Sequence, residues 1–144
     1  MQDRKRAQQV DREIAIVARV ILPDDPIEFD PLDEVQGLAE TAGAIVLSGL
    51  TQKREKPDTA TFLGRGKVEE LTQLVEFHAA DVVIFDNDLS PAQNRNLEIA
   101  LNIKVLDRTE LILDIFATHA QTYESRLAVE LAQLEYSLPR LKRM

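Results

Sequence analysis

The 144-residue chain contains no cysteine, no tryptophan and only two histidines. Without cysteine, disulfides and thiolate metal centres are excluded. His78 and His119 lie far apart in the sequence, so a histidine metal site has little support. No run of about 18 apolar residues is present, and no apolar stretch follows the N-terminal Met-Gln-Asp-Arg-Lys-Arg. We therefore expect no membrane span and no secretory signal, and we expect a cytoplasmic protein.

Acidic residues outnumber basic ones by 25 to 17, which gives a formal net charge of −8. Phosphate repels such a chain overall, so it is not a general nucleic-acid coat. Positive charge is nevertheless concentrated between residues 53 and 67 and at both ends of the chain. We predict that these patches contact phosphate, the alternative being solvated loop and tail charges. The candidate contacts are Lys53, Arg54, Lys56, Arg65, Lys67, Arg140, Lys142 and Arg143.

Four apolar runs that alternate with helical patterns indicate the fold class. They cover residues 12–22, 44–50, 81–86 and 104–107 and contain much isoleucine and valine. Continuous apolar strands are typical of a sheet covered on both faces, and intervening helices favour parallel pairing. We therefore predict an α/β fold, with a small four-stranded parallel sheet, flanking helices and one long C-terminal helix.

The segment 108–138 contains no glycine or proline. It is expected to form one helix roughly 45 Å long. Its apolar residues recur at spacings of three and four, the pattern of a coiled-coil seam with one stutter. The predicted seam is Leu113, Phe116, Ala120, Tyr123, Leu127, Leu131, Leu134, Leu138 and Leu141. A seam needs a partner helix, so either copies of the chain self-associate or the chain is part of a longer protein.

The sequence Gly64-Arg65-Gly66-Lys67 suggests a phosphate-binding turn. It is not a Walker loop, because one residue separates the glycines and Val68 stands where a metal-binding hydroxyl is required. Two interpretations remain. Gly64, Gly66 and Lys67 could bind a nucleotide at a helix N-terminus, or the stretch is a structural helix start beside an exposed basic loop.

Asp86 and Asp88 follow the third apolar run, where the carboxyl end of a parallel strand is expected. Two carboxylates there could hold magnesium, whereas the alternative is an ordinary turn from strand to helix. We identify no pairing of a nucleophile with a base, so enzymatic activity of this chain alone has little support.

Three strings carry a family resemblance: KPDTATFLGRGKVEEL, LSPAQNRNLE and VLDRTELILDIFATHAQTYESRLAVELAQLEYSLPRL. In this order they resemble the N-terminal domain of the HflX family of ribosome-associated GTPases. The resemblance covers most of the chain and is weakest before about residue 44. It implies an α/β N-terminal domain, an antiparallel two-helix hairpin and a Ras-like GTPase domain. It also implies binding to the large ribosomal subunit, approach to ribosomal RNA, and splitting of stalled ribosomes.

The chain departs from the family pattern because it contains neither a Walker motif nor Asn-Lys-x-Asp. We expect an α/β domain at residues 1–107 and the first hairpin arm at 108–144. GTP and magnesium are expected for the full-length family, and no cofactor for this chain. The expected partners are the large subunit, ribosomal RNA and the GTPase domain of a full-length parent.

Overall fold

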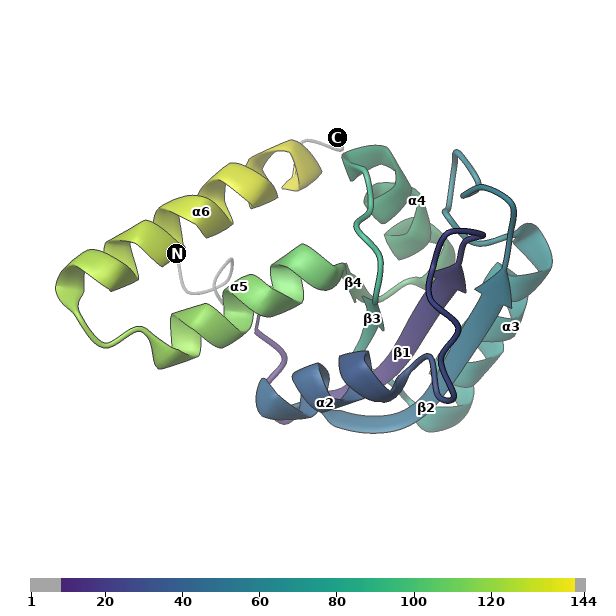
Figure 1. Ribbon diagram of the computed structural model, residues 1–144, viewed down its shortest axis with the longest axis horizontal. Helices are drawn as coiled ribbons and strands as arrows, with labels where there is room; N and C mark the ends of the chain where they lie inside the picture. The colour runs from purple at the N-terminus through teal and green to yellow at the C-terminus, as the bar shows by residue number, and fades with distance from the viewer. Residues whose placement is uncertain (1–8, 142–144) are drawn as a thin grey trace.

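The computed structural model describes residues 9–141, and for Leu141 the backbone only. The secondary structure alternates through four strands and ends in two consecutive helices (Figure 1). The order is β1 (Ile14–Ile21), α2 (Asp33–Thr41), β2 (Ile45–Lys53), α3 (Arg65–His78), β3 (Val82–Phe85), α4 (Pro91–Leu101), β4 (Lys104–Leu106), α5 (Arg108–His119) and α6 (Tyr123–Leu141).

The four strands form one sheet in the order β2-β1-β3-β4, and each neighbouring pair is parallel. The predicted α/β class and parallel sheet are therefore confirmed. All four residues of β3 are buried, which agrees with a strand covered on both faces. The chain moves from β1 outward to β2 and then returns to β3 on the other side. The carboxyl ends of β1 and β3 therefore flank the point where ligands bind in open sheets of this kind.

Helices cover both faces of the sheet and create two apolar clusters (Figure 1). On one face, Leu71 of α3 and Leu97 of α4 pack against Ile16 and Phe85. On the other face, Val35 of α2 and Leu111 of α5 pack with the opposite side chains of the strands. Each of these four helical side chains is fully buried, so apolar burial fixes α2 to α5 on the sheet.

The expected single helix over residues 108–138 is wrong, because α5 ends at His119 and α6 begins at Tyr123. Ala120 has extended backbone angles. Thr122 and Ser125 then form a reciprocal cap, in which each hydroxyl accepts a hydrogen bond from the other residue's amide, at 3.0 and 3.1 Å. Such caps start helices. A long C-terminal helix is present, but a second start signal divides the predicted one.

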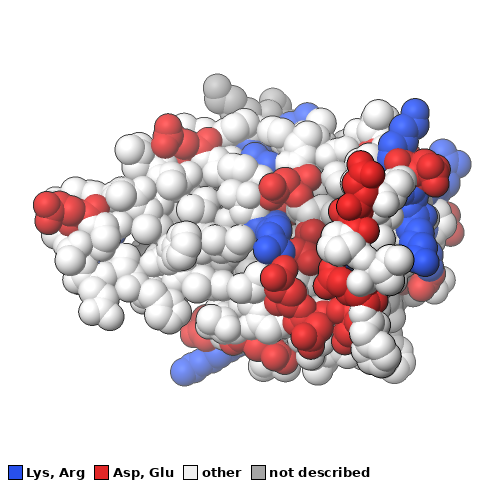
Figure 2. All heavy atoms as spheres, viewed as in Figure 1, with Lys and Arg blue, Asp and Glu red and all other residues white. Residues whose placement is uncertain are grey.

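After the break, α6 runs back antiparallel along α5 (Figure 1). Tyr136 and Arg140 approach the body of the domain and bond to Asp107. The predicted leucine seam does not make this contact, since Leu127, Leu131 and Leu138 remain about half exposed. Figure 2 shows a largely uncharged surface over α5 and α6. The apolar stripe of α6 is thus open on the described part of the chain.

No helix within residues 9–141 is both long enough and apolar enough to cross a membrane.

Candidate nucleic-acid interface

Five predicted contact residues lie at the carboxyl end of β2, in and beside the loop that leads to α3. We call residues 53–67 the basic loop. Lys53, Lys56 and Arg65 are exposed, while Arg54 and Lys67 are partly buried. Figure 2 shows Lys and Arg side chains gathered in the corresponding upper right part of this face. The structure therefore brings these five cations into one region of the surface.

Hydrogen bonds within the basic loop hold its backbone in a defined shape. Asp58 and Phe62 exchange two backbone hydrogen bonds of 3.0 Å. The Asp58 carboxylate also accepts from the amides of Ala60 at 2.8 Å and Thr61 at 3.1 Å. These amides lower the pKa of Asp58 because they stabilise its charged form. Phe62 has a φ of 66° and is nevertheless buried, and such a backbone persists where its surroundings enforce it.

Helix α4 supports the basic loop from outside. The side-chain amide of Gln93 donates to the Asp58 carbonyl at 2.9 Å, and that of Asn96 donates to the Ala60 carbonyl at 2.9 Å. Gln93 also completes the capping box with Ser90 at the start of α4. Two of the three strings that carry the family resemblance therefore meet in space. These two hydrogen bonds could not be predicted from the sequence, because no local pattern links residues 35 and 36 positions apart.

The glycine-lysine stretch forms the start of α3. The amide of Gly64 donates to the Gln52 side chain at 2.8 Å, and a Cβ at Gly64 would lie 2.8 Å from an Arg54 nitrogen. Lys67 pairs with Glu70 one turn later, at 3.2 Å. The atoms nearest to a Cβ at Gly64 are the ends of the flexible Arg54 and Gln52 side chains, which could move aside. The structural helix start and the nucleotide loop both stay predictions for this stretch.

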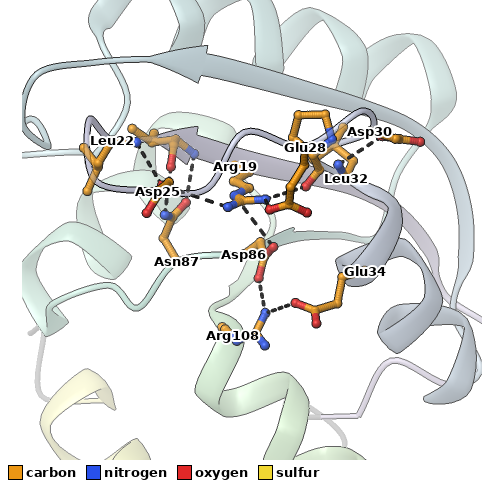
Figure 3. Close-up of polar contacts among 12 residues, drawn as sticks. Arg19, Leu22, Asp25, Glu28, Asp30, Leu32, Glu34, Asp86, Asn87 and Arg108 are labelled. Atoms are coloured by element: carbon orange, nitrogen blue, oxygen red, sulfur yellow. Dashed lines mark hydrogen bonds and ion pairs between the residues drawn. The ribbon is translucent and has the colours of Figure 1, made fainter.

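At the topological switch point, charged side chains of this chain occupy the end of the sheet (Figure 3). Asp86 follows β3 and pairs with Arg108 on α5, and it lies 4.0 Å from Arg19 on β1. Arg108 also pairs with Glu34 at 3.0 Å. Asn87 bonds both the amide and the carbonyl of Val20, at 2.9 and 3.0 Å.

Burial raises the pKa of Asp86, and the hydrogen bond from Arg108 opposes that rise. The same Asp86 hydrogen bond raises the pKa of Arg108. Both shifts follow from a charged pair removed from much of the solvent. This network joins β1, β3, α2 and α5 at the position where related sheets bind ligands.

The carboxylates considered for magnesium have protein partners. Asp86 is engaged by arginine, and Asp88 accepts from the amide and hydroxyl of Thr109, at 3.2 and 2.7 Å. Among residues 9–141, no three His, Cys, Asp or Glu side chains are grouped to hold a metal ion. Both carboxylates are bonded to side chains of α5, and the turn interpretation of this segment stays a prediction.

Arg140, near the basic C-terminus, is buried and does not lie on the surface. Arg140 is 7% exposed, and its guanidinium lies over the Tyr136 ring, 3.7 Å from the centroid. It donates to the Leu89 carbonyl and to Asp107. Burial with Asp107 removes Arg140 from the surface in this structure, which speaks against its predicted RNA contact, and that contact stays a prediction. Lys142 and Arg143 lie outside the described residues.

Asp107 is the centre of this C-terminal cluster and is completely buried. Its carboxylate accepts from the amides of Leu89 and Glu110, both at 3.0 Å, and from the Tyr136 hydroxyl. Burial raises the pKa of Asp107 against the effect of these donors. Burial and the charge of Asp107 together raise the pKa of Glu110 to about 8. The docking of α6 thus depends on a buried polar cluster.

Comparisons with known proteins show which family the chain belongs to. Residues 30–117 match the family described as GTP-binding GTPase N-terminal. GTPase HflX of Alkalihalophilus pseudofirmus is 46% identical over 141 residues, which cover 98% of this chain. The chain belongs to the HflX family and corresponds to its N-terminal domain. GTPase HflX of Escherichia coli K12 is 43% identical over 131 residues, or 91% of this chain.

Solved structures of GTP-binding proteins contain a domain with a fold similar to that of this chain. A structure of SsGBP in complex with GDP matches 90% of this chain with a TM-score of 0.69 and 29% identity. A GTP-binding protein from Sulfolobus solfataricus in complex with GDP has a TM-score of 0.65 over 89% of this chain, at 28% identity. The chain spans about a third of the length of its curated HflX relatives, covering 33% of the Alkalihalophilus pseudofirmus protein and 30% of the Escherichia coli protein.

Proposed function

We propose that this HflX N-terminal domain binds the large ribosomal subunit and that its basic loop contacts ribosomal RNA. The supporting observation is a surface of five cations on a loop whose backbone is fixed from within and by α4. A fixed loop backbone favours phosphate binding by its cations, because less backbone entropy is lost when they bind. The contacts are Lys53, Arg54, Lys56, Arg65 and Lys67.

The open stripe on α6 has a separate role in this proposal. Tyr123, Leu127, Leu131 and Leu138 are 48–75% exposed and recur at helical spacing. Exposed apolar stripes of this kind pack against other helices. We assign the stripe to the second arm of an antiparallel hairpin, as the family resemblance implies. In the full-length protein, this hairpin would lead to a GTPase domain that uses GTP and magnesium, and ribosome splitting would be an activity of that whole protein in the cytoplasm.

Sedimentation with purified ribosomal subunits tests the binding function. The chain is expected to pellet with large subunits in near-physiological salt and to remain in the supernatant with small subunits. Equal recovery with both subunits, or none with either, would contradict the proposal.

Calorimetry separates this function from nucleotide binding at Gly64–Lys67. Titration of the chain with GTP or ATP in the presence of magnesium is expected to give no binding heat. A saturable micromolar isotherm would favour the nucleotide-binding alternative. Light scattering of the same sample would reveal self-association through α6 as a mass that rises with concentration.

A further inference from the structure

The loop between β1 and α2 exposes two large apolar side chains. We call residues 22–34 the acidic loop, a segment that runs into the first turn of α2. Ile27 and Phe29 are 103% and 108% exposed, so neither side chain contacts the body of the domain. Single exposed apolar residues are normal on protein surfaces. Two at alternate positions of one loop, both completely exposed, are a feature that needs an explanation.

The acidic loop is held in place although its two apolar side chains point into solvent. Arg19 on β1 donates to Glu28 at 3.0 Å and to the Pro31 carbonyl at 2.9 Å. Asp25 accepts from the Leu22 amide at 2.9 Å, and Figure 3 shows these contacts around Arg19. Prolines at positions 23, 26 and 31 restrict the backbone further. Ile27 and Phe29 are thus presented by an ordered loop, which lowers the entropic cost of docking.

A groove of about 440 Å³ lies between the acidic loop and the end of β2. Its apolar lining includes Ile21, Leu22 and Ile27, and Lys53 and Arg54 line it as well. Ile27 therefore adjoins a concave surface, and Phe29 follows two residues later on the same loop. This combination of projecting apolar groups and an adjoining groove fits a protein surface of complementary shape.

The charge of the acidic loop limits the kind of partner. Six carboxylates and no cation occur between residues 24 and 34: Asp24, Asp25, Glu28, Asp30, Asp33 and Glu34. Figure 2 shows Asp and Glu side chains gathered on this part of the face, beside the separate group of Lys and Arg. Phosphate would be repelled here, whereas a lysine- and arginine-rich protein surface would be attracted.

We propose that the acidic loop docks on a basic protein of the large ribosomal subunit, with Ile27 and Phe29 inserted into apolar sockets. This inference rests on the proposed ribosome binding. The neighbouring basic loop is proposed to contact RNA. The acidic loop on the other side of the groove carries the opposite charge, so we propose that it contacts protein. Two adjacent loops of opposite charge would then fix the orientation of the domain on a mixed surface of RNA and protein.

Photocrosslinking tests the identity of the partner. The photoreactive residue p-benzoylphenylalanine is placed at position 29, and at position 77 on α3 as a control, since Phe77 is also 83% exposed. Each protein is irradiated on purified large subunits, and adducts are identified by mass spectrometry. Position 29 is expected to give an adduct with a ribosomal protein at a lysine- or arginine-rich segment, and position 77 is expected to give none. An adduct with RNA or with a second copy, or no adduct from position 29, would overturn the inference.

A pair of double variants tests the energetic role of the loop. Ile27→Ser with Phe29→Ser is compared with Phe77→Ser and Ile99→Ser, which alter exposed apolar residues on α3 and α4. The loop variant is expected to bind large subunits about tenfold more weakly or worse, because buried apolar anchors dominate protein interfaces. The control pair is expected to bind like the unmodified chain.

The outcomes separate this inference from the proposed function. If the unmodified chain binds large subunits and the loop variant binds equally well, the docking inference alone fails. If the unmodified chain does not bind at all, both fail. Matching thermal unfolding midpoints of the two double variants would establish that lost binding does not reflect lost folding.

Discussion

Gln93 on α4 donates its side-chain amide to the main-chain carbonyl of Asp58, 35 residues earlier in the chain, at 2.9 Å. The same side chain accepts a hydrogen bond from the Ser90 amide at the start of α4. One glutamine therefore closes a helix cap and supports the basic loop. Helix α4 therefore helps to fix the position of the loop that carries the predicted RNA contacts.

Replacement Gln93→Leu is expected to lower the free energy of unfolding by about 1–2 kcal/mol, because it removes half of a capping box and a loop hydrogen bond. Backbone amides in residues 56–63 should also exchange faster with solvent. Urea unfolding and hydrogen exchange measure both effects. Gln36→Leu on the exposed face of α2 is the matched control and should change neither by a comparable amount.

Replacement Asp107→Ala is expected to destabilise the domain by about 3 kcal/mol or more, because it removes a buried carboxylate that accepts hydrogen bonds from Tyr136, Arg140 and two backbone amides. Hydrogen exchange should increase throughout α6 and much less in α3. Asp88→Ala removes an exposed carboxylate that also caps α5, and it should cost about 1 kcal/mol. Equal costs for the two variants would contradict the role of Asp107 in holding α6.

Stability is expected to fall as pH rises from about 4.5 to 8 through Glu110. Its folded pKa is raised to about 8 from an ordinary 4.5, so in this window the folded state holds a proton that the unfolded state has lost. The slope from one such group is at most about 1.4 kcal/mol per pH unit. Glu110→Gln should remove this part of the slope in urea unfolding between pH 5 and 8, whereas Glu69→Gln at an exposed position should not. Parallel curves for Glu110→Gln and the unmodified chain would refute the assignment.

Replacement Arg19→Ala is expected to loosen the acidic loop, since Arg19 bonds Glu28 and the Pro31 carbonyl. Amides of residues 24–32 should exchange faster. The free energy of unfolding should fall by about 1–3 kcal/mol, because Asp86 loses a nearby positive charge. Arg12→Ala, at an exposed arginine before β1, provides the comparison. An unchanged exchange pattern in the acidic loop would show that the loop is held by other contacts.

The parallel sheet could be predicted from the sequence, because β3 and its neighbours are short, continuous apolar runs. Such runs are buried on both sides only in a strand whose sheet is covered on both faces. Strand order could not be read, since every parallel order of such runs is equally apolar. The break before Tyr123 was missed although Thr122 and Ser125 carry a capping signal, because the apolar spacing continues across it. Leu127, Leu131 and Leu138 of the predicted seam are about half exposed, and their packing against a second hairpin helix stays a prediction.

The candidate site was only partly readable from the sequence. The cluster of cations from Lys53 to Lys67 is local in the sequence, and the structure keeps it together. Arg140 is also a cation, but it is buried because it bonds to Asp107, a residue that lies near it only in the folded chain. The supports from Gln93 and Asn96, and the exposure of Ile27 and Phe29, likewise depend on tertiary structure.

The most direct test of the account is the salt dependence of large-subunit binding by a charge-reversed basic loop. Lys53→Glu with Arg65→Glu should weaken binding and reduce the slope of log K against log salt by roughly 0.7–0.9 for each lost phosphate contact. Arg12→Glu with Arg126→Glu changes the net charge equally at sites away from the loop and should leave that slope unaltered. If both double variants gave the slope of the unmodified chain, the basic loop would not be the surface that holds ribosomal RNA.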